Sequence, residues 1–107
     1  MITVANIRQT KDGEYIGRAM PRQRLQGSPL GNPYRLAHKN DPRKPVIEAY
    51  RRWLDNQLYS PNSPQAREIE RLTELARAGD LVLLCWCAPL SCHGDVIKEI
   101  IEARLAE

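Results

Sequence analysis

The stretch LVLLCWCAPLSCHGDVIKEI, from Leu81 to Ile100, constrains the fold more than any other part of the chain. Its first part, Leu81 to Cys87, is short and almost wholly apolar, and it lies between Gly79-Asp80 and Pro89. That pattern is typical of a strand buried on both faces. Further on, the apolar residues recur at helical spacing, at Val96, Ile97, Ile100, Ile101 and Leu105. The stretch therefore predicts a strand, a sharp loop and a helix.

All three cysteines and one of the two histidines lie where this strand gives way to the helix. In open α/β sheets, ligands bind outside the carboxyl ends of the strands, and the start of a helix offers unpaired N–H groups to anions. Because side chains alternate along a strand, Cys85 and Cys87 would face the same side. Cys92 and His93 would lie in the first helical turn, with Asp95 close behind. The sequence thus predicts a functional site at this loop.

Three interpretations of the loop stay open. A helix N-terminus and nearby basic groups can lower the pKa of a thiol, which makes Cys92 the best-placed nucleophile, with His93 as base or acid and Asp95 as an orienting or acid/base partner. No cofactor is predicted, but a zinc site is the alternative, with Cys85, Cys87, Cys92 and His93 as ligands. Zinc ligands usually come as two separate pairs, whereas these four lie within nine residues. The sulfurs could also simply fill the core, which suits Cys85.

The bulk composition limits the class of protein. A chain of 107 residues allows one domain and no second core. Its 42% hydrophobic and 27% charged residues are typical of a globular protein, and no apolar run approaches the roughly 20 residues that span a bilayer. The N-terminus has no charged leader followed by an apolar block. Three clustered cysteines cannot form a complete disulfide framework, so we expect a cytosolic protein without a membrane partner.

The formal net charge is only +3, but the positive residues are concentrated in the first half of the chain. That half contains only four acidic residues, Asp12, Glu14, Asp41 and Glu48. Its basic residues are Arg8, Lys11, Arg18, Arg22, Arg24, Arg35, Lys39, Arg43, Lys44, Arg51 and Arg52. A solvated surface accounts for most of them, but such a half could also attract a phosphate-bearing ligand or a nucleic acid.

The first half predicts two strands and a long loop. Ile2 to Ile7 is rich in β-branched residues and predicts a strand, and Tyr15 to Arg18 can return beside it as a second short strand. Ala19 to Pro45 has no period and is punctuated by proline and glycine. Within it, Gly31-Asn32-Pro33 predicts a stiff backbone that either positions a ligand or forms a rigid surface turn.

Two helices are predicted between this loop and the cysteine-rich stretch. Asp41 is the expected cap of the first, along which Val46, Tyr50, Trp53, Leu54 and Leu58 recur at helical spacing. Ser63 and Pro64 open the second, which ends at Gly79. The order predicts a small single α/β domain with a short mixed sheet, in which the strand Leu81 to Cys87 is central and helices pack on the sheet.

Several of these motifs together resemble a known family. They are Tyr15-Ile16-Gly17-Arg18, Gly31-Asn32-Pro33-Tyr34, the helix around Val46 to Leu54, and Cys85-Trp86-Cys87-Ala88-Pro89 followed by Cys92-His93-Gly94-Asp95. Across nearly the whole chain they are similar to a small bacterial and phage family known only as domain of unknown function 4326. The family brings no established reaction, cofactor or partner. Its motifs occur together, and the resemblance therefore implies one shared site built from Gly17, Arg18, Gly31, Asn32, Cys87, Cys92, His93 and Asp95. The segment Met20 to Ser28 is less similar to the family pattern, so no site residues are expected there.

We expect a pocket where the loop Gly31 to Tyr34 folds over the start of the last helix. Arg18 and Arg35 would supply charge to a phosphate or carboxylate, and Asn32 would hydrogen-bond it. The expected ligand is small, anionic and nucleotide-like, and whether the protein is an enzyme stays open. The alternatives are a non-catalytic protein that binds a host protein or nucleic acid through its basic half, and a zinc-stabilised scaffold. A phage-encoded protein would act in the cytoplasm of the bacterial host.

Overall fold

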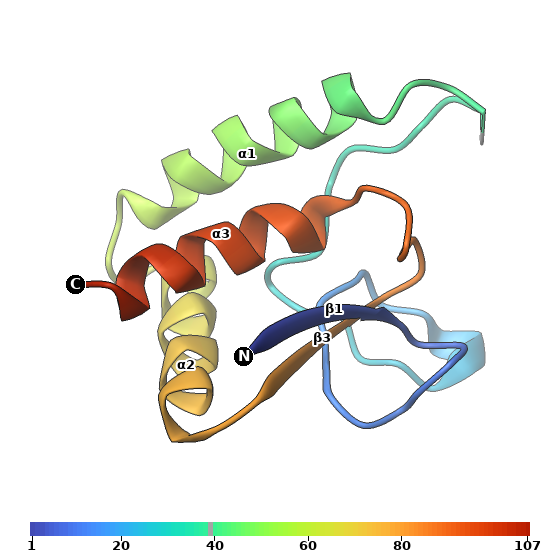
Figure 1. Ribbon diagram of the computed structural model, residues 1–107. Helices are drawn as coiled ribbons and strands as arrows, with labels where there is room; N and C mark the ends of the chain where they lie inside the picture. Colours follow the sequence, from blue (N-terminus) through green and yellow to red (C-terminus); the bar gives the residue numbers. More distant parts are fainter. Residues whose placement is uncertain (39) are drawn as a thin grey trace.

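The computed structural model describes residues 1–38 and 40–107 (Figure 1). Lys39, one of the basic residues of the first half, lies outside the described residues. The elements follow in the order β1 (Ile2–Asn6), β2 (Glu14–Tyr15), a short 3-10 helix (Pro21–Gln23), α1 (Lys44–Leu58), α2 (Pro64–Ala78), β3 (Leu81–Cys85) and α3 (His93–Leu105). The fold is therefore α/β, as predicted. None of the helices in the described ranges combines the length and the apolar character needed to cross a membrane.

The three strands form one sheet in the order β1-β3-β2, so the predicted central position of β3 is confirmed. Both pairings are parallel, where a mixed sheet was expected. The register sets Asn6 of β1 opposite Cys85 of β3, and Tyr15 of β2 opposite Leu84. All three strands consequently end at the same edge of the sheet, which is the edge where ligands bind in open α/β folds.

The predicted return of the second strand beside the first is wrong, because β1 and β2 lie on opposite sides of β3. The chain crosses β3 at Gly13, whose φ of 157° is unfavourable for other residues. A Cβ there would lie only 2.7 Å from the Val82 carbonyl oxygen. The Lys-Asp-Gly-Glu sequence at residues 11–14 therefore carries the chain over the strand rather than turning it back.

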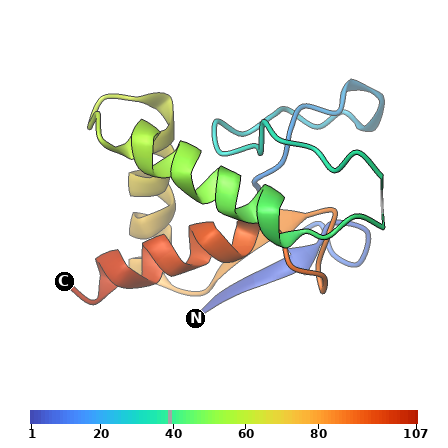
Figure 2. The ribbon, with the colours of Figure 1, turned by 90° about the horizontal axis from the view of Figure 1, so that it is seen from above.

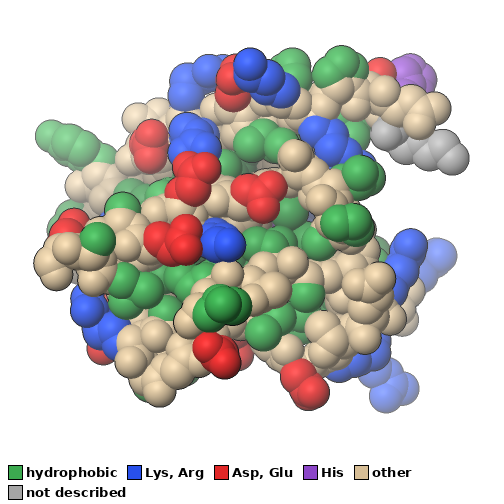
Figure 3. Space-filling model, viewed as in Figure 1, with side chains coloured by type: hydrophobic (Ala, Val, Ile, Leu, Met, Phe, Trp, Pro, Cys, Tyr) green, Lys and Arg blue, Asp and Glu red, His purple; other side chains and the backbone are tan. Residues whose placement is uncertain are grey.

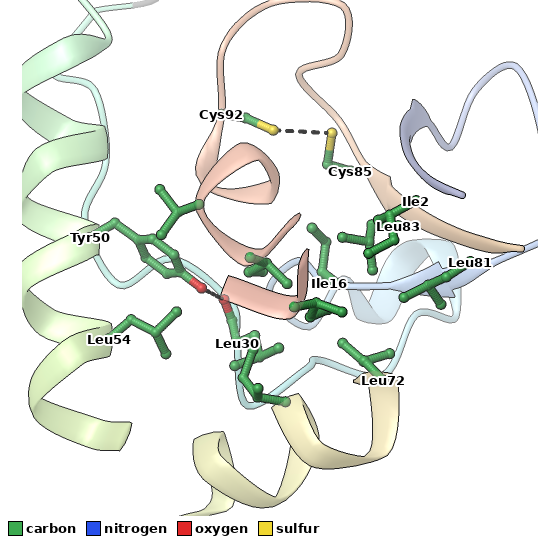
Figure 4. Packing of buried hydrophobic residues seen from close by; sticks show 14 residues of the cluster. Ile2, Ile16, Leu30, Tyr50, Leu54, Leu72, Leu81, Leu83, Cys85 and Cys92 are labelled. Atoms are coloured by element: carbon green, nitrogen blue, oxygen red, sulfur yellow. Dashed lines mark hydrogen bonds between the residues drawn. The ribbon is translucent and has the colours of Figure 1, made fainter. Parts of the chain in front are cut away.

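Helix α3 is the centre of the packing and contacts β1, β3, α1 and α2. In both ribbon views the three helices occupy one end of the molecule, and the loops that carry residues 16–38 and 40–43 occupy the other (Figures 1 and 2). The side chains buried between the helices and the sheet form one cluster (Figure 4), which includes Ile2, Ile16, Leu30, Tyr50, Leu54, Ile69, Leu72, Leu83, Val96, Ile97 and Ile101. The loops are thus left to shape a site beside the sheet edge.

The helix ends agree with the sequence at α2 and differ at α1. Ser63 caps α2 by accepting a hydrogen bond from the Ala66 N–H at 3.0 Å, and Gly79 follows its last residue, as predicted. The prediction that Asp41 caps α1 is wrong, because Arg43 occupies the N-cap position without a side-chain cap. The Asp41 carboxylate instead accepts from the His38 N–H at 2.8 Å, which stabilises the turn before the helix.

A Tyr50→Phe variant is expected to lose about 1 to 2 kcal/mol of unfolding free energy. The buried Tyr50 hydroxyl donates to the Leu30 carbonyl at 2.7 Å, and its removal leaves that oxygen without its partner (Figure 4). Urea denaturation measures the difference. Tyr59→Phe is the matched control, because Tyr59 is 92% exposed and should show no change. Equal losses in both variants would contradict this role for the buried bond.

Candidate functional site

The strand β3 ends at Cys85, two residues earlier than the sequence predicts, and the reason is Asn6. The Asn6 amide donates to the carbonyls of Trp86 at 3.1 Å and of Ala88 at 3.0 Å. These bonds turn the backbone out of the sheet ladder directly after Cys85. Asn6, the last residue of β1, thereby fixes the cysteine-rich loop against the end of that strand.

The start of α3 is closed by its own side chains. Cys92 is the N-cap residue, and its sulfur accepts from the Gly94 N–H at 3.3 Å. The Asp95 carboxylate reaches back to the Cys92 N–H at 3.1 Å, which completes a capping box. Cys92 and Asp95 therefore lie where the sequence predicts. Their side chains, however, accept hydrogen bonds from N–H groups that were expected to bind an anion.

The segment Tyr15 to Arg18 is held by one tyrosine hydroxyl. It accepts from the indole N–H of Trp86 at 3.1 Å and donates to the Arg18 carbonyl at 2.7 Å. The Tyr15 ring lies directly over Gly17, where a Cβ would come within 2.6 Å of the ring Cζ. Gly17 is thus required by this close contact, which ties the start of the long loop to the cysteine-rich loop.

The loop around Asn32 lies against the same segment. A Cβ on Gly31 would be 3.2 Å from the carbonyl carbon of Gly17, so the two glycines bring their backbones together. The Asn32 amide oxygen accepts from the Tyr34 N–H at 2.9 Å, and its NH₂ group is the end that can donate to a ligand. The predicted stiffness of this loop therefore has a physical basis in its own hydrogen bonds.

These segments enclose a cavity of about 370 Å³ beside the carboxyl edge of the sheet. Seven residues expected to form or hold the site line it: Gly17, Arg18, Asn32, Arg35, Cys87, Cys92 and His93. In Figure 3 the molecule is hollowed at its right edge, beside the N-terminal end of α1, with Lys and Arg side chains along the lower border. The arginines of the first third and the thiols near the end of the chain thus converge on one space.

Two of the expected residues, Gly31 and Asp95, do not line the cavity and support it from behind. Cys85, expected only as a possible zinc ligand, and Tyr34, expected only as part of the loop over the pocket, also line the cavity. The remaining lining residues were not named from the sequence: Tyr15, Met20, Leu36, Arg43, Val46, Ile47, Trp86 and Ser91. The segment Met20 to Ser28 was expected to hold no site residue, and the presence of Met20 in the cavity lining corrects that expectation. Arg43 is the most important residue that the sequence analysis did not assign to the site. It precedes α1 without forming a side-chain cap, and only the basic character of the surrounding sequence could have indicated it.

A family model described as a domain of unknown function (DUF4326) matches residues 3–103. The chain belongs to this family. The match confirms the resemblance drawn from the motifs. Comparison with curated proteins and with solved structures gave no match.

Of the family motifs, the Ile-Gly-Arg segment gives a direct test of the site geometry. A Gly17→Ala variant is expected to lose about 1 to 3 kcal/mol of unfolding free energy, because the added methyl displaces the Tyr15 ring from its two hydrogen bonds. Thermal denaturation measures the loss. Gly79→Ala is the control, since nothing lies within 4 Å of a Cβ there. A Gly17→Ala protein as stable as Gly79→Ala would contradict the close contact.

Three guanidinium groups, of Arg18, Arg35 and Arg43, line the cavity, and no Asp or Glu is found among its described lining residues. The ion pairs of residues 1–38 and 40–107 involve none of these arginines. Burial, and then the like charge of Arg35, lower the pKa of Arg18 from its ordinary value. Positive charge is therefore gathered here at an electrostatic cost, which an anionic ligand would offset.

The three thiols are not equivalent. The thiol of Cys92 donates a hydrogen bond to the Cys85 sulfur at 3.5 Å, and its interactions with Cys85 and Cys87 together with burial raise the pKa of Cys92 strongly. Interaction with the Cys92 thiol, assisted by Arg43 and Arg18, lowers the pKa of Cys87 to about 6. The same donor lowers the pKa of Cys85 to about 6, but a single thiol proton cannot serve both sulfurs. Cys87 is half-buried and has the two arginines, so it is the sulfur best placed to carry negative charge.

The imidazole of His93 is largely buried, with 8% of its surface exposed, and Nε2 lies 2.8 Å from the Ile16 carbonyl oxygen. That bond requires a proton on Nε2, so Nδ1 is the nitrogen that can accept one. Burial lowers the pKa of His93, and the positive charge of Arg18 adds a smaller lowering. The hydrogen bond to the Ile16 carbonyl acts in the opposite direction but is outweighed. His93 is accordingly a neutral group near pH 7.

The sulfurs and the imidazole do not form a ready metal site. Within the described ranges, no three His, Cys, Asp and Glu side chains are grouped so that they could hold a metal ion. The sulfurs of Cys85 and Cys92 lie 3.5 Å apart, and His93 is directed at a backbone carbonyl. The zinc alternative would need these side chains to rearrange, and elemental analysis of the purified protein is its direct test.

Proposed function

We propose that the cavity binds a small phosphate-bearing ligand of nucleotide-like form. The observation that supports this proposal is the meeting of Arg18, Arg35 and Arg43 around one cavity whose described lining holds no carboxylate. Guanidinium groups present several N–H donors in a fixed plane, which suits the oxygen atoms of a phosphate. The NH₂ group of Asn32 adds a neutral donor at the same wall.

The remainder of the cavity suits a planar, partly apolar group. Tyr34, Trp86 and Ile47 line it, and Tyr34 is 42% exposed near its mouth. A volume of about 370 Å³ lies within the range of roughly 300 to 1,000 Å³ that is usual for small-molecule sites. A nucleoside monophosphate fits this division, with its phosphate at the arginines and its base against the aromatic wall.

Any covalent reaction on that ligand would use Cys87 rather than Cys92. The Cys92 sulfur caps α3 and holds its proton, whereas Cys87 faces the arginines and carries a lowered pKa, about 6. His93 offers Nδ1 as a proton acceptor, and Asp95 acts as a positioning residue through the Cys92 N–H. This assignment revises the sequence-based choice of nucleophile and keeps the same loop.

Thermal denaturation with a panel of ligands tests the proposal. Nucleoside monophosphates, the matching nucleosides and inorganic phosphate are each added to the purified protein. A ligand at one hundred times its Kd stabilises a fold by about 2.7 kcal/mol, which raises the melting temperature by several degrees. We expect this rise with at least one monophosphate and a smaller one with its nucleoside. No rise with any phosphate-bearing compound would contradict the proposal.

The alternative of a nucleic-acid-binding protein makes a different prediction. Binding through exposed basic residues such as Arg22 and Arg24 would tolerate many sequences, and its affinity would fall steeply with salt. Arg18, Arg35 and Arg43 instead line one cavity together, which favours a small ligand. Salt-dependent binding of DNA or RNA that survives substitution of Arg18 would favour the alternative.

A further inference from the structure

Three sulfurs from two different segments meet at the inner wall of the cavity. Cys85 ends β3, Cys87 follows it in the loop, and Cys92 begins α3. The Cys92 thiol donates a hydrogen bond to the Cys85 sulfur at 3.5 Å (Figure 4), and all three sulfurs belong to residues that line the same cavity. All three are free thiols. Cys92 thus contacts Cys85 directly and shares the cavity wall with Cys87, and phosphate binding does not require such an arrangement.

The exposure of the three thiols follows an order. Cys87 is half-buried at the cavity, while Cys92 and Cys85 are only 4% and 1% exposed. A small reagent that enters the cavity therefore meets Cys87 first. Arg43 and Arg18 act on the Cys87 sulfur, so they can stabilise negative charge that develops on a departing oxygen beside it.

We propose that Cys87, Cys92 and Cys85 form a thiol relay that reduces a small hydroperoxide by two electrons. The Cys87 thiolate attacks one peroxide oxygen, so that an S–O bond forms and the O–O bond breaks. The products are Cys87 sulfenic acid and an alkoxide (hydroxide from hydrogen peroxide), which takes up a proton. The Cys92 thiol then attacks the Cys87 sulfur, which forms a disulfide and releases water.

The third cysteine completes the relay. The Cys85 thiol attacks the Cys92 sulfur, forms a Cys85–Cys92 disulfide and returns Cys87 to its thiolate. The net reaction converts one hydroperoxide and two thiols into an alcohol, water and one disulfide, and an external thiol must reduce that disulfide before a second cycle. The relay does not rest on the proposed phosphate function, because it needs the sulfurs and no bound phosphate. Each proposal can therefore fail while the other holds.

The experiment treats the reduced protein with one equivalent of hydrogen peroxide. Remaining thiols are blocked with iodoacetamide, disulfides are then reduced, and the released thiols are labelled with N-ethylmaleimide. All three cysteines lie on the tryptic peptide Ala78 to Lys98, so fragmentation of this peptide assigns each label. We expect iodoacetamide on Cys87 and N-ethylmaleimide on Cys85 and Cys92. Three unreacted thiols, or oxidised Cys87 with no disulfide, would overturn the proposal.

Substitutions separate the steps. Cys92→Ser keeps a side chain that caps a helix well, and it should accumulate Cys87 sulfenic acid that dimedone traps. Cys85→Ala should stop the reaction at a Cys87–Cys92 disulfide. Cys87→Ser should slow oxidation of the buried pair by about tenfold or more, because that pair then lacks an accessible thiolate. Circular dichroism verifies that each variant is folded, and a wild-type rate of disulfide formation in folded Cys87→Ser would refute the relay.

Discussion

An Arg18→Gln variant is expected to bind its phosphate-bearing ligand about 10 to 100 times more weakly than the wild type. A hydrogen bond to a charged group contributes about 1.5 to 3 kcal/mol, and each 1.4 kcal/mol is a tenfold change in affinity. Arg18 lines the cavity together with Arg35, so its guanidinium is placed to contact a phosphate bound there. Isothermal titration calorimetry with the most stabilising monophosphate measures the change.

The control for Arg18→Gln removes the same charge elsewhere. Arg67 is exposed on α2, away from the cavity lining, and Arg67→Gln should keep its affinity within about twofold. The matching nucleoside offers a second comparison, because its affinity should be nearly equal in wild type and Arg18→Gln. If both arginine variants weaken binding equally, the effect is one of net charge and the assigned site is incorrect.

The unliganded Arg18→Gln protein should not be markedly less stable than the wild type. Arg18 and Arg35 repel each other, and this repulsion contributes to the lowered pKa of Arg18. Removing one charge relieves the repulsion and offsets the packing lost with the longer side chain. A variant that loses binding but keeps its stability identifies a side chain retained for a ligand rather than for the fold.

The strand, loop and helix around the cysteines could be predicted because local sequence determines them. The apolar run at Leu81 to Cys85 is too short and too uniform for a helix, and the spacing from Val96 onward changes the period. Parallel strands then end at one edge, so the loop after β3 had to lie near the ends of β1 and β2. The meeting of distant motifs follows from that topology.

The pairing of the first two strands could not be predicted, because it depends on a contact between distant residues. The local sequence around Gly13 is typical of a tight turn. In the structure Gly13 instead passes close to Val82, and a side-chain Cβ at this position would lie only 2.7 Å from the Val82 carbonyl oxygen. The end of β3 likewise depends on a contact between distant residues. Asn6 lies 80 residues before Trp86 in the sequence, and their hydrogen bond is what ends the strand.

The roles within the site were harder to predict than its location. A cysteine and an acid three residues apart at a helix start suggest an active nucleophile with its partner, but the same spacing also forms a capping box. The structure shows the second arrangement for Cys92 and Asp95. Cys87 then gains its lowered pKa, about 6, from a neighbour five residues later and from Arg43, which belongs to another element. Sequence spacing alone does not contain that information.

The alkylation of Cys87 by iodoacetamide is expected to follow a pH profile with its midpoint near 6, where an unperturbed cysteine gives about 8.5. The thiolate is the reactive form, so the rate should fall as the pH falls through 6. The folded pKa lies below the unfolded value, so the thiolate also stabilises the fold. That contribution is complete above about pH 8.5 and is lost as the pH falls through 6. Fragmentation of the tryptic peptide Ala78 to Lys98 in the mass spectrometer distinguishes alkylation of Cys87 from alkylation of the other two cysteines on the same peptide.

Two substitutions at Cys92 separate its hydrogen bond from its capping role. Cys92→Ala removes the donor that contributes most to lowering the pKa of Cys87, and its midpoint should move well above 6. Cys92→Ser keeps both a donor and an N-cap, so its midpoint should stay close to that of the wild type. Arg43→Gln should give an intermediate value, because only the second donor is lost. Identical midpoints for the alanine and serine variants would mean that Cys92 does not hold the proton that activates Cys87.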